Sequence, residues 1–342
     1  MSTAVLFAVA AGLCSALPLL LGVFAPGGML LVILTPLPLF LAGLAQGVGG
    51  AIIAGVTASA IIGVLGGLVM AAMTAIILAA PVAVLVRQAL LSRALGAGAA
   101  GGPTSGGPAG DAAGSGPGGV PGGGPATGTA RDWYPAGLLV TWLTVIGLAW
   151  LAVAFVVQGT SSGIEAGVRE DLLHSLQMLL PEAQPDDLAQ VAEAIAPFAV
   201  GSGMLGWLLL LAVNGVLAQG LLTRFGRNLR PAPDIATLTL PTWLAPALGL
   251  ALAAALLGSQ DLAYIGRNVA LVLVLPFFFA GLGTIHALTR GLKARAAILV
   301  TLYIVLIFFS VWPAVLVAGL GLVEPWLGLR RRFTSAPDQE EE

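Results

Sequence analysis

The first 86 residues contain no Asp, Glu, Lys or Arg, and Arg87 is the first charged residue of the chain. Water cannot solvate so long an apolar segment, so its solvent must be the hydrocarbon of a membrane. Lipid offers backbone groups no hydrogen-bond partners, and each crossing must therefore be a helix or part of a closed barrel. The apolar runs are continuous, which selects helices. With 58% hydrophobic and 9% charged residues, the sequence predicts an all-α, polytopic transmembrane helical bundle.

Apolar runs of about 20 residues, the length that crosses a bilayer, divide the chain into about ten spans. The last run, 296–328, is too long for one ordinary helix, and Ser310, Trp312 and Pro313 near its centre indicate a hairpin of two short spans. A single span there would give nine. The other expected spans are 4–24, 29–47, 49–67, 69–91, 136–158, 197–222, 241–259 and 268–289.

Positive charge distinguishes nine spans from ten, because short cytoplasmic loops accumulate Lys and Arg. With ten spans and a cytoplasmic N-terminus, only Arg169 and Arg267 of the 14 Lys and Arg residues fall outside. Nine spans would move the cluster 330–332 to the other side. We therefore expect a protein of the bacterial cytoplasmic (inner) membrane with both termini in the cytoplasm.

Composition divides the chain into four parts. Residues 96–128 hold 15 glycines and 5 prolines, a composition typical of a flexible linker without a packed core. The expected parts are a four-span bundle at 1–93, a disordered linker at 94–132, a six-span bundle at 133–333 and an acidic cytoplasmic tail at 334–342.

Within the six-span bundle, residues 160–196 are acidic and have a helical pattern. Apolar residues spaced by about four from Ile164 to Leu179 predict one amphipathic helix, which Pro181 ends. Pro185 and the acids after it suit the start of a second helix. We expect both helices either on the outer surface of the membrane or over the bundle. Asp261 and Arg267 flank the turn before the eighth span, where they can pair with each other.

Two of the first spans have a face of small residues. Such faces let helix backbones approach closely in lipid. They serve either packing within the bundle or docking of another membrane subunit, and the residues alone leave both readings open. The faces are Ala4, Ala8, Gly12 and Ala16 in the first span, and Gly55, Ser59, Gly63 and Gly67 in the third.

Prolines interrupt the first four spans. A broken helix at membrane depth can expose its carbonyl groups to a substrate cavity, although proline is also common in ordinary membrane helices. The prolines are Pro18, Pro26, Pro36, Pro38 and Pro81.

The most specific polar cluster lies in the segment GLGTIHALTRGLK. Gly283, His286 and Arg290 are spaced so that they share one face of the eighth span. They are the candidate substrate-binding residues, because a histidine there can relay protons or bind an anion together with an arginine. Asn214 in the sixth span is a fourth candidate. The competing interpretation is a helix-end histidine, an arginine that reaches the headgroups and an asparagine that joins helices.

Catalytic motifs are lacking. The sequence has no nucleophile beside a base, no zinc-protease motif and no phosphate-binding loop. Cys14 is the one cysteine, and His174 and His286 are expected on opposite sides, so we expect no metal site and no cofactor. The expected partners are the lipid bilayer, a small-molecule solute and a membrane or ATPase subunit, and not nucleic acid. We do not expect an enzyme.

Three segments resemble the YybS-like family of bacterial multispanning membrane proteins of unknown function: residues 36–67, GLGTIHALTRGLK and the closing GLVEPWLGLRRRF. The N-terminal half is also similar to substrate-binding S components of energy-coupling-factor transporters, whose first helix presents a small-residue face to a partner subunit. The corresponding small-residue face of this chain consists of Ala4, Ala8, Gly12 and Ala16. S components have about six spans, fewer than expected here.

Two functions are compatible with these features. The first is a permease-like or small-solute-binding membrane component in which a cavity forms between the two bundles. The second is a non-catalytic membrane scaffold that recruits envelope or cytoplasmic partners through its small-residue faces and basic loops.

Overall fold

The computed structural model describes residues 2–24, 29–94, 131–159, 163–309 and 311–330. Nearly all of these residues are helical, and the strands among them are the short pair β1 (Ser92–Ala94) and β2 (Arg131–Trp133). The predicted all-α class is confirmed. The helices are α1 (Thr3–Phe24), α2 (Met29–Val32), α3 (Pro36–Gln46), α4 (Val48–Met73), α5 (Ala80–Ala89), α6 (Ala136–Gln158), α7 (Ile164–Leu179), α8 (Pro185–Ile195), α9 (Ala199–Arg224), α10 (Leu244–Leu257), α11 (Gln260–Leu288), α12 (Arg295–Phe309) and α13 (Val311–Leu327).

Three shorter helical turns join these helices: η1 (Thr74–Ala79), η2 (Ala196–Phe198) and η3 (Ile235–Thr237). The η1 segment has π-helical geometry and continues α4 into α5. The η2 turn leads from α8 into α9, and η3 precedes α10.

Five helical stretches of the described residues are long and apolar enough to cross a membrane, and four more are shorter but apolar. The longest, Val48–Ala89, is interrupted at Gly67, whose φ of +83° and ψ of 174° are not helical. On either side of it, Gly63 faces Ala71 and Gly55 faces Ala79. This stretch therefore forms two antiparallel helices. The count of ten membrane spans stays a prediction.

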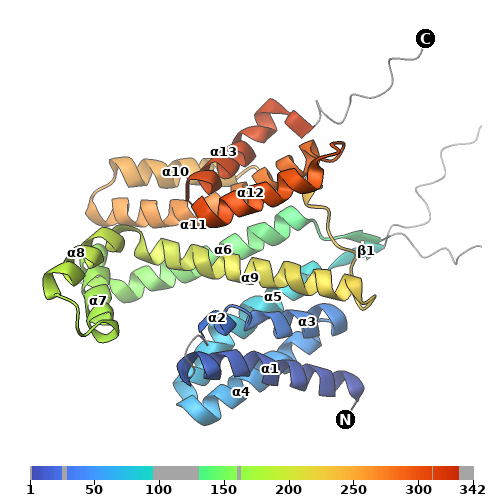
Figure 1. The fold of residues 1–342 in the computed structure, drawn as a ribbon, viewed down its shortest axis with the longest axis horizontal. Coiled ribbons are helices and arrows are strands. Elements are labelled where there is room, and N and C mark those ends of the chain that lie inside the picture. The colour runs from blue at the N-terminus through green and yellow to red at the C-terminus, as the bar shows by residue number, and fades with distance from the viewer. Residues whose placement is uncertain (1, 25–28, 95–130, 160–162, 310, 331–342) are drawn as a thin grey trace, which may run out of the picture.

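The helices form three layers (Figure 1). In that view α1–α5 lie on one side, α6 and α9 in the middle, and α10–α13 on the other side. The layers meet where α3 packs on α9, α5 on α6, and α11 on both α6 and α9. The helices α7 and α8 lie at one end, here named the α7/α8 end, and the opposite end, which contains β1, β2 and η3, is named the β1/β2 end.

The α11 helix begins at Gln260, eight residues before the predicted start at residue 268. The expected pairing of Asp261 with Arg267 is wrong. Both side chains lie within α11 and bind α7 instead: Asp261 accepts a hydrogen bond from the Ile164 amide, and Arg267 pairs with Glu165. Asp261 and Arg267 are thus accommodated in α11 because each has a partner on α7.

The two predicted amphipathic helices are present as α7 and α8. Ile164 and Val168 on α7 and Leu188 and Ala192 on α8 are buried. Their apolar sides thus face the protein, which leaves the charged sides exposed at the α7/α8 end.

Residues 95–130 of the predicted linker and the predicted tail at 334–342 lie outside the described residues. The residues that flank the linker are described. Strands β1 and β2 pair antiparallel, with Arg93 opposite Asp132 and Ser92 opposite Trp133. The chain therefore leaves the helical layers and returns to them at one place, beside the start of α6.

Candidate functional site

The structure places Gly283 and His286 in the last turns of α11 and Arg290 two residues after its end, at the β1/β2 end. Gly283 approaches the Ile235 carbonyl of η3 so closely that a side chain would not fit. The Nδ1 atom of His286 lies 2.9 Å from the Leu282 carbonyl oxygen, and its ring lies 6.1 Å from that of Tyr303 on α12. Arg290 forms an ion pair with Asp234, just before η3. These three residues thus contact protein groups at one end of the bundle.

The pair between Arg290 and Asp234 is open to water, since 49% and 42% of the two side chains are exposed. The hydrogen bond from Arg290 lowers the pKa of Asp234, and a bond from the Ala236 amide acts in the same direction. Asp234 is therefore a firmly ionised partner at neutral pH.

Sequence reasoning missed Arg330, which it used only as an indicator of topology. The Arg330 guanidinium donates to the carbonyls of Ala236, Leu238 and Ala280 at 2.7–3.0 Å and to the Thr284 hydroxyl at 3.0–3.1 Å. Burial lowers the pKa of Arg330, while Glu324, 3.7 Å away, raises it. The side chain joins α13, η3 and α11 at the β1/β2 end.

Arg230 connects the N-terminal layer to the middle layer at the same end and is only 5% exposed. Its guanidinium donates to the Ala89 carbonyl at 3.0 Å and to the Tyr134 carbonyl at 2.8 Å. Burial lowers the pKa of Arg230. Its contacts fix the end of α5 against the start of α6.

Asn214 lies apart from the other three predicted binding residues, in the middle of α9. Its side-chain nitrogen donates to the carbonyls of Ile33 and Leu210, each at 2.8 Å. Ile33 belongs to the turn between α2 and α3, so Asn214 joins the middle layer to the N-terminal layer. The residues around Asn214 in the sequence do not indicate that its partner is the Ile33 carbonyl, so this contact could not be predicted.

The small-residue faces lie against other helices of the same chain. Ala8 and Ala16 are buried, whereas Ala4 is exposed. A side chain at Gly12 would meet Ala54 and Thr57 of α4. In the third span, Gly55 and Gly63 face the returning helix, Ser59 is buried, and Gly67 forms the turn.

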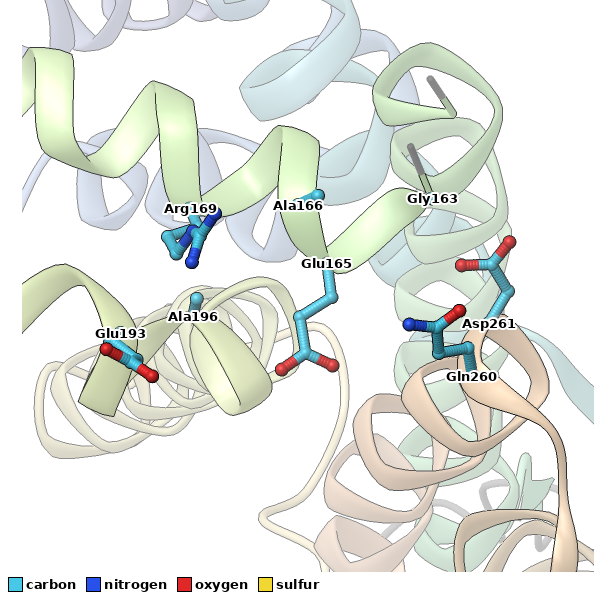
Figure 2. Close-up of a pocket in the computed structure, with 8 residues that line it drawn as sticks. All are labelled: Gly163, Glu165, Ala166, Arg169, Glu193, Ala196, Gln260 and Asp261. Carbon is cyan, nitrogen blue, oxygen red and sulfur yellow. The ribbon is translucent and has the colours of Figure 1, made fainter. Parts of the chain in front are cut away.

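A hollow of about 290 Å³ opens at the α7/α8 end (Figure 2). Figure 2 shows Arg169 of α7 and Glu193 of α8 on one side of it, Glu165 at the centre, and Gln260 and Asp261 of α11 on the other side. The remaining lining residues are Gly163, Ala166 and Ala196.

The charges around the hollow differ in whether they are paired. Glu165 pairs with Arg267 at 2.7 Å, and Asp261 accepts the Ile164 amide at 3.0 Å. Among the described residues, neither Arg169 nor Glu193 has an ion-pair partner. The hollow thus presents one cation and one carboxylate that are available to a solute of mixed charge. Sequence reasoning treated this segment as a surface helix pair, because nothing local indicates that α11 completes the hollow.

No group of three or more His, Cys, Asp or Glu side chains is arranged to hold a metal ion in the part of the chain that the structure describes. The carboxylates at the hollow come from three helices and include two that already have partners. The arrangement therefore suits recognition of an organic solute better than metal coordination.

A family model described as "Predicted membrane protein (DUF2232)" matches residues 130–324, more than half of the chain. The match covers β2 and nearly all the helices that follow, and it includes the hollow, Asn214 and the last turns of α11. It does not include α1–α5, so the expected resemblance of these spans to S components stays a prediction. No curated protein and no solved structure matches the chain.

Proposed function

The chain belongs to the DUF2232 family of predicted membrane proteins, and from this premise we propose that it is a permease-like, non-enzymatic component that binds a small zwitterionic solute. The observation that supports this is the hollow at the α7/α8 end, where the unpaired side chains of Arg169 and Glu193 line one cavity. Arg169 suits a carboxylate or phosphate group of the solute, and Glu193 suits an ammonium group. The volume, about 290 Å³, is near the lower limit for small-molecule sites.

The charges at the two ends support an orientation for this proposal. Apart from Arg169 and Arg267, all the Lys and Arg residues that the structure describes lie at the β1/β2 end. By the positive-inside rule, we assign that end to the cytoplasm and the hollow to the outer face of the inner membrane. The solute would then reach the hollow from outside the cell.

Within this proposal, the solute leaves at the β1/β2 end, where it contacts Gly283, His286 and Arg290. The ion pair of Arg290 with Asp234 is exposed and would have to open for release on that side. His286 presents its Nε2 atom for a transient contact, since its Nδ1 is bound to the Leu282 carbonyl. The expected resemblance of the first spans to S components favours an ATPase partner subunit as the energy source in this proposal.

The alternative of a scaffold has weaker support. The small-residue faces, which that reading assigns to partners, lie against α4 and its returning helix. A partner at those faces would have to displace helices of the chain itself.

Equilibrium binding by the purified protein in detergent tests the proposal. We would compare an amino acid or a betaine with a simple amine and a simple carboxylate of similar size. The proposal expects saturable binding of a zwitterion, with single-charge compounds at least about tenfold weaker, since a hydrogen bond to a charged group contributes about 1.5–3 kcal/mol.

Variants at the hollow make the test specific. Glu193→Gln and Arg169→Gln should each weaken binding by about tenfold. Glu170→Gln is the matched control, because Glu170 is exposed on α7 but does not line the hollow. Equal binding by all three variants and the unchanged protein would contradict a site at the hollow.

A further inference from the structure

Two buried side-chain oxygen atoms at the turn between α2 and α3, one from the turn and one from α9, have no hydrogen-bond partner among the described residues. Thr35 is 2% exposed and Asn214 is fully buried. The Thr35 hydroxyl and the Oδ1 atom of Asn214 both lack a hydrogen-bond partner among the described residues. An unsatisfied polar atom in the interior costs free energy, so two at one turn need a physical reason.

The Thr35 hydroxyl lies in this turn, and Asn214 of α9 lies beside it. The Nδ2 atom of Asn214 donates to the Ile33 carbonyl at 2.8 Å, which holds the neighbouring Oδ1 atom beside residues 33–35. Ser15 of α1 approaches from another side, and its hydroxyl donates to the Thr35 carbonyl at 2.7 Å. Oxygen atoms of three segments, α1, the turn and α9, therefore meet where the helix is broken.

The turn presents oxygen atoms and few N–H groups. Pro36 and Pro38 at the start of α3 have no N–H, and the Leu37 amide already donates to the Leu34 carbonyl. A helix start with free amides would attract an anion, but this one lacks them. Carbonyl and hydroxyl oxygens instead favour a hard cation.

We infer that this turn binds one monovalent metal cation of the size of Na⁺, with Thr35 Oγ1 and Asn214 Oδ1 as its side-chain ligands. A single charge fits better than two, because no Asp or Glu occurs before residue 111 and α9 has none. Neutral oxygens at a broken membrane helix are a known way to bind such an ion.

The site would connect two parts of the molecule. Thr35 and Ser15 precede the predicted linker and Asn214 follows it, and the ion would hold α9 against the α2/α3 turn. Use of this ion to couple transport to a gradient rests on the proposed function. Binding of the ion does not, because the turn is separate from the hollow at the α7/α8 end.

The test measures equilibrium binding of radioactive Na⁺ to the purified full chain in detergent, with choline replacing Na⁺ at constant ionic strength. The inference expects saturable binding of about one ion per chain, in the millimolar range because no carboxylate compensates its charge. Thr35→Val keeps the shape of the side chain and removes the ligand, and it should weaken binding at least about tenfold.

Thr144→Val is the matched control. Its hydroxyl is also buried, but it donates to the Val140 carbonyl of its own helix, so this variant should bind Na⁺ normally. Retained binding in Thr35→Val would overturn the inference, as would the absence of saturable binding to the unchanged protein. If the unchanged protein shows no saturable Na⁺ binding, the turn holds water only.

Thermal unfolding of the unchanged protein provides a second measurement that needs no variant. At constant ionic strength, Na⁺ in place of choline should raise the midpoint by roughly 3 °C at ten times the dissociation constant. An equal midpoint in both salts would overturn the inference. Loss of solute binding at the hollow with normal Na⁺ binding would instead contradict only the proposed function.

Discussion

The N-terminal layer, α1–α5, and the layer around α11 are held together in different ways. In the first, backbones approach at small residues: Gly12 meets α4, and Gly55 and Gly63 meet the returning helix. In the second, polar side chains with little exposure also reach other elements, as Asn268 reaches η2 and α9 and Arg330 reaches η3 and α11. Shape complementarity thus dominates one region, and directed hydrogen bonds are added in the other.

Gly12→Leu should lower the free energy of unfolding most, because the new side chain would not fit between α1 and α4. A Cβ atom there would lie 2.5 Å from the Ala54 carbonyl oxygen and 2.6 Å from the Thr57 Cβ. A shift of the α4 backbone to make room would cost free energy, so we expect the free energy of unfolding to fall by more than about 3 kcal/mol. Thermal unfolding in detergent measures it. Gly49→Leu, with no atom within 4 Å of its Cβ position, should be nearly neutral; equal losses in both variants would contradict close packing at Gly12.

Arg330→Met tests the polar links of the second region. It leaves the carbonyls of Ala236, Leu238 and Ala280 without a donor, and the expected loss is about 3 kcal/mol. Lysine should not restore it, because an ammonium group lacks the planar fork of donors. Arg87→Met, at an exposed arginine of α5, is the control. An unfolding midpoint equal to that of the control would contradict the role of Arg330.

Asn268→Leu should have a smaller effect. Asn268 is fully buried, accepts the Gly201 amide at 2.7 Å and donates to the carbonyls of Pro197 and Tyr264. We expect a loss of about 2 kcal/mol, since two carbonyls and one amide lose their partner. Hydrogen exchange should report opening first at η2 and the start of α9. Unchanged exchange there would contradict a link at Asn268.

The pair of Asp234 with Arg290 should have the smallest effect. The pKa of the Asp234 carboxyl group is lowered in the folded protein. The pair therefore stabilises the fold above the unfolded-state pKa of about 3.9. This contribution is lost as the pH falls through the pKa of folded Asp234. Because both side chains are largely exposed, the contribution is below about 1 kcal/mol. Unfolding midpoints between pH 6 and pH 3 should fall slightly less in Arg290→Gln. An identical pH profile would contradict the pairing.

The same comparison explains what the sequence could predict. The N-terminal spans, their hairpin at Gly67 and the helices α7 and α8 follow from local patterns of apolar, small and proline residues. The early start of α11 could not be predicted, because Asp261, Arg267 and Asn268 are stabilised by partners 67–102 residues away. The hollow was missed for the same reason, since it needs α7, α8 and α11 together.

One labelling experiment tests the central claim, a solute site at the α7/α8 end that faces outward. Cys14 is the one cysteine of the chain, so Cys14→Ser with Ala166→Cys puts a single thiol at the hollow. In intact cells, a membrane-impermeant maleimide should label this variant, and a zwitterionic solute should slow the labelling by at least about tenfold at saturation. Labelling only after permeabilisation, or at a rate that no solute changes, would contradict the account.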